Sequence, residues 1–159
     1  MIDRRTFAGM TGVAAVALVL VGRSGAAAST HFSVRHSADE WRRILGTQRY
    51  AVLREAATER AFSSPLLNEN RKGLFVCAGC ALPLFSSATK FDSGTGWQSF
   101  WRPLPRAVVN HAERSLLMER TEVLCARCGG HLGHVFDDGP KPTGLRYCMN
   151  GLALQFRPG

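Results

Sequence analysis

The chain has 159 residues, enough for one domain with a hydrophobic core and too few for two ordinary domains. Its formal net charge is +8 at pH 7, but the basic residues are scattered among acidic ones, and no run is dense enough to predict a nucleic-acid-binding stripe. Five cysteines in so short a chain point to metal binding, disulfide formation or thiol chemistry.

The first 28 residues have the pattern of an export signal. Paired arginines at positions 4 and 5 precede an uncharged, mostly apolar run over 8–22, and three alanines follow at 26–28. This order is that of a cleaved signal, and the arginine pair is typical of the twin-arginine (Tat) route, which exports folded proteins. An uncleaved membrane anchor is the alternative, although the apolar run is shorter than the roughly 20 residues of a spanning helix.

Cleavage after Ala28 predicts a periplasmic protein with a linker over 29–36 and a folded domain over 37–157. Three arginines and one aspartate leave with the signal, so the formal charge falls from +8 to +6. A net positive charge this small is typical of an ordinary solvated surface. We therefore expect the Tat export machinery as a partner, no nucleic acid, and a monomeric protein.

A helical segment is predicted at the start of the domain. Residues 37–40 have the S-x-x-E form of a capping box, and apolar residues follow at 41, 44 and 45 with helical spacing. Gly46 interrupts the pattern, Thr47 can cap a second helix, and a second apolar stripe continues to about Arg60. We therefore expect two short helices that pack against a sheet.

From Gly73 onward the pattern of apolar and turn-forming residues changes. Short runs rich in Val, Leu and Phe are separated by Gly, Pro, Asp and Ser, and there is no long helical period. This pattern predicts a mainly β domain. Candidate strands lie at 74–77, 83–85, 99–102, 107–110, 116–124, 134–136 and 145–156. We expect the last of these to be bent or broken near Asn150 and Gly151.

Four of the five cysteines form two C-x-x-C pairs, Cys77 with Cys80 and Cys125 with Cys128. Each pair can present two thiolates from one tight turn, so together they match a tetrahedral Cys₄ zinc site. Two disulfides are the alternative in an oxidising compartment, although a bridge within one pair closes only a very small loop. A thioredoxin-like active pair needs a β-α-β context, which the sequence lacks.

Cys148 remains after the two pairs are assigned. On a strand, Arg146 and Asn150 share its face, whereas Tyr147 and Met149 lie on the opposite face. A polar trio around a thiol is unusual in a core, and the positive charge of Arg146 favours the nucleophilic thiolate. An inert buried cysteine is the alternative, and the polar neighbours argue against it.

The chain also carries a series of ordered motifs between about residues 37 and 156. These are Thr58-Glu-Arg60, Cys77-Ala-Gly-Cys80, Thr89-Lys-Phe-Asp-Ser-Gly94-Thr-Gly-Trp97, Ser99-Phe100, Cys125-Ala-Arg-Cys128-Gly, His131-Leu-Gly-His134-Val-Phe136-Asp137, Pro142-Thr-Gly144 and Arg146-Tyr-Cys148-Met-Asn150. Together they resemble the methionine-R-sulfoxide reductase B (MsrB) family. The resemblance implies two antiparallel sheets with short N-terminal helices, a structural Cys₄ zinc ion, and reduction of the R epimer of methionine sulfoxide, free or in oxidised proteins.

The resemblance also implies roles for the matching residues. Cys148 would be the nucleophile, and Trp97 would pack against the methyl group of the substrate. The other expected pocket residues are polar or border the substrate, namely His131, His134, Asn150, Arg146, Phe136 and Asp137. A sulfoxide sulfur is electrophilic when its oxygen is protonated, so one histidine would supply a proton while Cys148 attacks. The products would be methionine and a Cys148 sulfenic acid.

These roles have plainer alternatives. His131 and His134 lie beside a C-x-x-C pair, so they are alternatively zinc ligands or partners of the zinc ligands. Trp97 taken alone is more often a core residue. As a whole, the chain is alternatively an exported zinc-ribbon binding module in which Cys148 is incidental, or an exported dithiol-disulfide oxidoreductase that uses a C-x-x-C pair.

The sequence departs from the family pattern near the pocket. Thr95 stands in the loop before the tryptophan, where many family members have a second, resolving cysteine. We therefore expect an external thiol reductant, such as a thioredoxin-like protein, to reduce Cys148. Gln98 replaces a common proline, and Gly151 replaces a common serine. Both changes loosen turns near the pocket without removing a reacting group.

Overall fold

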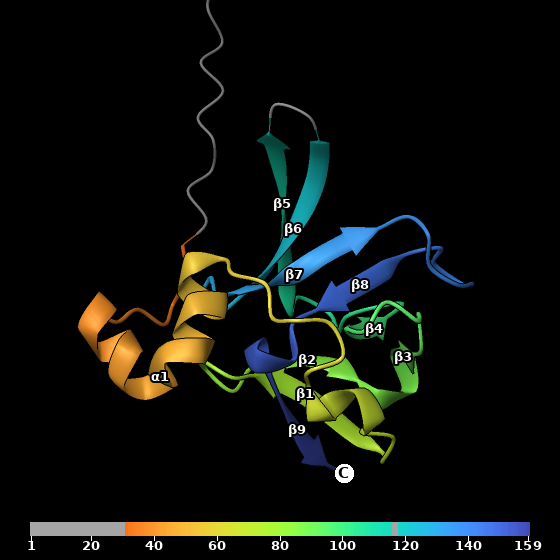
Figure 1. Ribbon diagram of the computed structural model, residues 1–159, viewed down its shortest axis with the longest axis horizontal. Helices are drawn as coiled ribbons and strands as arrows, with labels where there is room; N and C mark the ends of the chain where they lie inside the picture. Colours follow the sequence, from red (N-terminus) through yellow and green to blue (C-terminus); the bar gives the residue numbers. More distant parts are fainter. Residues whose placement is uncertain (1–30, 116–117) are drawn as a thin grey trace, which may run out of the picture. The chain divides into compact units, whose positions relative to one another are not determined.

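The computed structural model describes residues 31–115 and 118–159 (Figure 1). The expected export signal over 1–28 and the first residues of the expected linker lie outside these ranges. Across the two described ranges, no helix is both long and apolar enough to cross a membrane. The described chain consists of a helical segment followed by two β-sheets, which is the mainly β class that the sequence predicts.

Helix α1 (Ala38–Glu55) begins with the predicted capping box. Ser37 Oγ accepts a hydrogen bond from Glu40 N at 3.3 Å, and the Glu40 carboxylate accepts one from Ser37 N at 2.7 Å. These bonds satisfy backbone donors that have no partner within the helix. Gly46, with φ 67° and ψ 172°, breaks the helical path, so the predicted interruption is confirmed.

The helix ends at Glu55, and the prediction that it continues to about Arg60 is wrong. Ala56 takes a left-handed conformation with φ 54°, and the following residue, Ala57, donates to the carbonyl of Ala51 at 3.0 Å. This six-residue hydrogen bond closes the helix end. The chain beyond it leads to Glu59, which is buried.

The strands form two antiparallel sheets, as the resemblance implies (Figure 1). The smaller sheet has the order β2-β1-β9, with bounds β1 (Gly73–Cys77), β2 (Pro83–Ser86) and β9 (Leu154–Pro158). The larger sheet has the order β3-β4-β8-β7-β6-β5, with bounds β3 (Lys90–Phe91), β4 (Gln98–Phe100), β5 (Val108–Ser115), β6 (Met118–Cys125), β7 (His131–Phe136) and β8 (Arg146–Met149). Among the described residues, the 3₁₀ helix η1 (Pro65–Asn68) lies between α1 and β1, η2 (Ser87–Thr89) between β2 and β3, and η3 (Gly151–Ala153) between β8 and β9.

Most predicted strands are present, with shifted ends. β5 and β7 are longer than predicted because polar residues such as His111 and His131 pair across the sheet without giving an apolar signal. The predicted strand 99–102 ends at Phe100. The predicted strand 145–156 is broken by η3, which follows Asn150 as expected. β3 was not predicted because it has only two residues.

Aromatic rings pack between the two sheets. Phe75 of β1 and Phe85 of β2 lie against Phe100 of β4, with ring centroids 5.0 and 4.4 Å from that of Phe100. Tyr147 of β8 adds a ring 5.9 Å from Phe85. Burial of each phenylalanine contributes about 1.5–3 kcal/mol. This cluster therefore holds β8, the strand that carries Cys148, against the smaller sheet.

Candidate functional site

Four cysteine sulfurs meet where the two sheets adjoin. Cys77 ends β1 and Cys125 ends β6, while Cys80 and Cys128 lie in the turns that follow. All four Sγ atoms lie within 4.8 Å of one another. Two of the contacts join different turns, with 3.8 Å between the sulfurs of Cys77 and Cys128 and 3.5 Å between those of Cys80 and Cys125. The predicted grouping is therefore confirmed.

This geometry fits a metal better than disulfides. A disulfide bond requires an S–S distance of about 2.05 Å, and the cysteines are free thiols at larger distances. A tetrahedral zinc ion with Zn–S bonds of about 2.3 Å separates its sulfurs by roughly 3.8 Å. Hydrogen bonds shared among the four thiols lower the pKa of Cys80 and Cys125 and raise that of Cys77 and Cys128, so the sulfurs interact as one group.

The two cysteine turns share one backbone pattern. In each, the first cysteine accepts a hydrogen bond from the residue four positions later and donates one to the residue five positions later, at 2.8 Å around Cys77 and 2.9 Å around Cys125. The residue four positions later is left-handed, with φ 60° at Ala81 and 67° at Gly129. Gly79 N also donates to Cys77 Sγ at 3.4 Å. The chain thus holds both sulfurs of each pair in the same arrangement.

Cys148 lies in a polar row that crosses the larger sheet. Its direct cross-strand partners are Ser99 of β4 and His134 of β7. The row continues to Glu122 of β6 and His111 of β5. Directly paired residues have Cβ atoms about 4.5–5.5 Å apart on the same face. The register therefore brings together polar residues that are far apart in the sequence.

The other face of β8 belongs to the core. Tyr147 and Met149 are buried, whereas Arg146 and Cys148 are partly exposed, so the predicted alternation along this strand is confirmed. Both Nε and one terminal nitrogen of Arg146 donate to the Asp138 carboxylate at 2.8 Å. The carboxylate that holds Arg146 is thus Asp138, while the candidate Asp137 is exposed.

Arg146 also contacts Phe136. Its guanidinium carbon lies 4.4 Å from the centroid of the Phe136 ring, which is exposed at the end of β7. The two residues face each other directly across β7 and β8, two positions along from the His134–Cys148 pair. The candidate substrate-side residue Phe136 therefore lies on the face of Cys148, held by a cation–π contact.

Burial and charge act in opposite directions on Cys148. Burial raises the pKa of its thiol above the usual value, while the positive charge of Arg146 and a contact with Thr95 lower it. Thr95 Oγ1 lies 4.0 Å from Cys148 Sγ. The expected effect of Arg146 is present, but burial outweighs it. The resting group at neutral pH is therefore a protonated thiol.

Two histidines of β7 lie beside one another on this face. Nδ1 of His131 is 2.6 Å from the Glu122 carboxylate, and its Nε2 is buried without a hydrogen-bond partner among the residues that the structure describes. Nε2 of His134 is 3.3 Å from the Glu113 carboxylate. Burial lowers the pKa of His134. The ring centroids are 5.4 Å apart, so two carboxylates hold two adjacent imidazoles.

An irregular strand brings these histidines together. Residues three apart on a regular strand point to opposite faces. The pairing of β6 with β7 shifts register between Val123 and Leu124, next to His131. Gly133 has φ 153°, and a β-carbon there would overlap the carbonyl oxygen of Cys148. Glycine at this position therefore lets β7 approach β8, the strand that carries Cys148, closely.

Glu59 connects the tryptophan loop to the segment after Cys148. Its carbonyl accepts a hydrogen bond from Trp97 Nε1 at 3.1 Å. Its buried carboxylate accepts bonds from Gly151 N at 2.6 Å and Leu152 N at 2.9 Å. Its own N–H donates to Asn150 Oδ1 at 3.0 Å. One side chain and its backbone thus fix two parts of the site relative to each other.

Asn150 is buried and both ends of its amide bind backbone groups. Oδ1 accepts from Glu59 N, and Nδ2 donates to the carbonyl of Leu132 at 3.3 Å. The structure therefore brings Asn150 to the site as a residue that positions the chain. Trp97 lies in the predicted loop, between the left-handed Gly96 and β4, with its ring partly exposed.

Sequence reasoning missed the four acidic residues that organise the site. Glu59 entered only as part of a motif, and Glu113, Glu122 and Asp138 were not singled out. The alternation of His111 with Glu113, and of Arg120 with Glu122, is a signal of two polar strand faces. It could have indicated carboxylates facing the histidines, but the register that pairs them is visible only in the sheet.

The sequence is similar to known proteins along most of its length. Residues 45–158 match the SelR domain. The chain is 49% identical over 128 residues to the peptide methionine sulfoxide reductase MsrB of Leptospira interrogans, covering 80% of this chain and 98% of that protein. It is 54% identical over 134 residues to the MsrB of Bradyrhizobium diazoefficiens, covering 82% and 94%. The protein of the same name from Agrobacterium fabrum is 53% identical over 126 residues, covering 79% and 93%. The chain therefore belongs to the SelR-domain, or MsrB, family.

Proposed function

We propose that this protein reduces methionine-R-sulfoxide to methionine with Cys148 as the nucleophile. One observation carries the proposal. Cys148 is separate from the four clustered sulfurs and lies between Ser99 and His134 on a polar sheet face. The substrate and its R configuration are supported by family membership, since the relatives are named peptide methionine sulfoxide reductases.

The first step transfers oxygen from the substrate to the enzyme. A histidine protonates the sulfoxide oxygen as the sulfur of Cys148 attacks the sulfoxide sulfur and forms an S–S bond, and the thiol proton passes to the histidine, which is restored. The hydroxyl then moves from the substrate sulfur to the Cys148 sulfur: the substrate S–O bond and the S–S bond break, a Cys148 S–O bond forms, methionine leaves, and Cys148 is left as a sulfenic acid. The substrate sulfur is reduced and the cysteine sulfur is oxidised by the same two electrons.

We infer that His131 supplies the proton. Its Nδ1 lies 2.6 Å from the Glu122 carboxylate, which fixes the orientation of the ring, and its Nε2 has no partner among the described residues. His134 has a longer contact of 3.3 Å with Glu113, and burial lowers its pKa, which favours the neutral ring. His134 would then contribute a hydrogen bond beside Cys148.

The second step requires a thiol from outside the chain. An external thiol attacks the Cys148 sulfenic acid, water leaves, and a mixed disulfide forms. A second thiol then releases Cys148 and carries away the disulfide. Thr95, 4.0 Å from Cys148 Sγ, occupies the place from which a resolving cysteine would act. A thioredoxin-like protein or a small dithiol has the required chemistry.

Zinc is the proposed occupant of the cysteine cluster, where it would stabilise the fold. The two pairs belong to β1 and β6, so the ion would join the smaller sheet to the larger one. Four thiolates around one ion leave no open position for a substrate, so this site takes no part in the reduction. Metal analysis of the purified protein should give one zinc ion per chain.

Export to the periplasm is proposed from the sequence alone. The twin-arginine pattern, the apolar run and the alanines at 26–28 support it. Replacement of both signal arginines by lysine should keep the protein in the cytoplasm. The mature periplasmic protein should begin at Ser29, which N-terminal sequencing would show, and its mass in gel filtration should be that of a monomer.

An assay with separate sulfoxide epimers tests the proposed activity. Purified protein with dithiothreitol should consume the R epimer of N-acetyl-methionine sulfoxide and leave the S epimer intact. Consumption of the S epimer alone, or of neither epimer by zinc-loaded folded protein, would contradict the proposal. A disulfide reductase activity that survives Cys148→Ser would favour the C-x-x-C oxidoreductase instead.

A further inference from the structure

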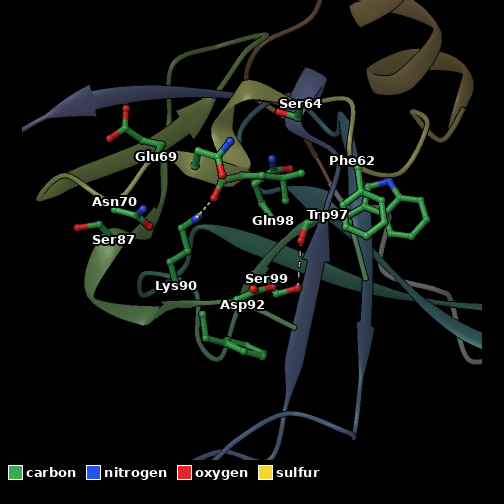
Figure 2. A pocket seen from close by; sticks show the side chains of 14 residues that line it. Phe62, Ser64, Glu69, Asn70, Ser87, Lys90, Asp92, Trp97, Gln98 and Ser99 are labelled. Atoms are coloured by element: carbon green, nitrogen blue, oxygen red, sulfur yellow. Dashed lines mark hydrogen bonds between the residues drawn. The ribbon is translucent and has the colours of Figure 1, made fainter. Parts of the chain in front are cut away.

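We propose that Phe62 is a second aromatic contact for the substrate and binds an apolar side chain next to the methionine sulfoxide in an oxidised polypeptide. This inference rests on the proposed function, because it concerns the residues around the same sulfoxide. Phe62 and Trp97 both line a cavity of about 520 Å³, and Figure 2 shows their side chains on the same side of it. This size is typical of pockets that bind small ligands.

The Phe62 ring lies mostly in solvent. It is 71% exposed, the highest value among the exposed large apolar side chains of the described residues. A single exposed apolar side chain is ordinary on a protein surface, whereas exposed apolar groups gathered at a cavity are typical of a binding site. The partly exposed Trp97, which we expect to pack against the substrate methyl group, lines the same cavity. The Phe62 ring therefore extends an apolar surface that the substrate is expected to contact.

The chain holds Phe62 in a conformation that phenylalanine rarely adopts. Its φ is 63°, in the left-handed region, within a turn that Ser63 N closes by donating to the carbonyl of Arg60 at 3.3 Å. Glycine is the usual residue at such turn positions. A bulky residue in this region is strained, and strained residues are concentrated at ligand-binding and active sites. Burial does not explain the strain, because the ring is exposed.

Two hydrogen bonds attach the Phe62 segment to the tryptophan loop. Phe62 N donates to the carbonyl of Gly96 at 2.8 Å, and Trp97 Nε1 donates to the carbonyl of Glu59 at 3.1 Å. The Phe62 ring also lies against the backbone of Gly96, where an added β-carbon would be 2.8 Å from two ring carbons. Each aromatic side chain is therefore fixed by the segment that carries the other, which makes a preorganised surface.

This surface is within reach of a peptide bound at Cys148. Thr95 directly precedes Gly96, and Thr95 Oγ1 lies 4.0 Å from Cys148 Sγ. Because neighbouring Cα atoms are about 3.8 Å apart, the path from this sulfur to the Phe62 ring is at most roughly 15 Å. An extended peptide advances by about 3.3 Å per residue, and the side chains at its ends add to this span. Residues one or two positions from the sulfoxide can therefore contact the ring.

An apolar side chain of the substrate fits this surface. The Phe62 ring has no charge and no hydroxyl, so burial of apolar surface is the main attraction that it offers. It adjoins the residue that is expected to contact the substrate methyl group. In a polypeptide substrate, the side chains beside the methionine sulfoxide are then the nearest groups that can cover the ring.

A comparison of two peptides tests this inference. Both have lysine at each end and the R epimer of methionine sulfoxide at the centre. The two positions on each side of the centre are leucine in one peptide and glycine in the other. We expect kcat/KM to be roughly 3–10-fold higher for the leucine peptide, as burial of about 30–50 Å² of apolar surface allows.

Two substitutions of Phe62 separate the ring from the backbone. Phe62→Asn removes the ring and introduces a residue that tolerates the left-handed conformation. It should bring the ratio close to one, by raising KM for the leucine peptide rather than lowering its kcat. Phe62→Tyr keeps the ring and should keep the preference for leucine. Phe62→Gly also suits the left-handed position and provides the same test if Phe62→Asn does not fold.

A matched control is Ile44→Asn on α1, since Ile44 is also exposed, at 54%, and does not line the cavity. It should keep the wild-type ratio. A wild-type ratio close to one, or an unchanged ratio in a folded variant that lacks the ring, would overturn the inference. A change confined to KM for a thioredoxin used as the reductant would also overturn it, since the ring would then bind the reductant. Failure of the wild-type protein to reduce either peptide would instead overturn the proposed function.

Discussion

The five cysteines occupy two regions that use the same side chain in opposite ways. In the cluster, four sulfurs lie within 4.8 Å of one another in two turns with the same backbone hydrogen bonds. At Cys148, a single thiol lies on a sheet face among residues from β4, β6 and β7. The cluster is built by local spacing and joins the sheets, whereas the Cys148 site is built by sheet register. Substitutions should therefore affect the first through folding and the second through chemistry.

The largest difference should come from removing the Cys148 thiol. Cys148→Ser should lower sulfoxide reduction by on the order of 10³-fold or more, because a hydroxyl is a far weaker nucleophile than a thiolate. The residue is not part of the metal cluster, so zinc content should be unchanged and the free energy of unfolding should change by less than about 1 kcal/mol. Activity assays, metal analysis and thermal unfolding measure the predicted activity, zinc content and stability in turn. Loss of zinc along with activity would show that the two regions are not independent.

The matching change in the cluster is Cys125→Ser. It should lower the melting temperature by on the order of 10 °C or more and abolish stoichiometric zinc, because metal binding contributes directly to the free energy of folding. Activity that remains should decline in proportion to the folded fraction. Circular dichroism during heating measures the melting temperature, with Cys148→Ser as the reference variant. A Cys125→Ser protein with full stability and no metal would contradict the structural role of the cluster.

A moderate effect is expected from the carboxylate behind His131. Glu122→Gln removes the carboxylate that lies 2.6 Å from Nδ1 of His131, the proposed proton donor, so kcat should fall by about 10–100-fold with a small change in KM. Glu113→Gln is the matched control, because its contact with His134 is longer, at 3.3 Å. It should have a smaller effect. A larger loss in Glu113→Gln would identify His134 as the acid.

The smallest effect should be a shift in the ionisation of Cys148. The positive charge of Arg146 lowers the pKa of this thiol, and burial raises it. Arg146→Met removes only the lowering contribution, so the pKa should rise further. The rate of alkylation by iodoacetamide should then reach its midpoint at a higher pH. Arg42→Met, at an exposed position on α1, is the control and should leave the profile unchanged. A midpoint at lower pH in Arg146→Met would contradict the assigned effect of the charge.

The fold could be predicted closely where the signal is local. The capping box at Ser37, the break at Gly46 and the two cysteine turns depend on residues a few positions apart, and all are present. The end of α1 was misplaced because Ala56 takes a left-handed conformation. Alanine rarely adopts this conformation, so the sequence gives no signal for it. The extra lengths of β5 and β7 were missed because their polar residues are stabilised by pairing across the sheet.

The sequence indicated candidate site residues but not their contacts. Cys148, Trp97 and the two histidines were candidates because they belong to recognisable motifs. The acidic residues that hold them were not, because Glu59 and Glu122 act on residues brought close only by the fold. The balance between burial and the charge of Arg146 also needed the structure, since burial cannot be read from a polar strand pattern.

Mass spectrometry after a single turnover tests the central distinction most directly. The protein would be given one equivalent of methionine-R-sulfoxide without reductant, and the position of any modification would be mapped by peptide analysis. We predict that Cys148 gains one oxygen atom, or an adduct of its sulfenic acid with a trapping reagent, while the four cluster cysteines stay unmodified. A disulfide between Cys148 and a cluster cysteine, or turnover that leaves Cys148 unchanged, would contradict the account.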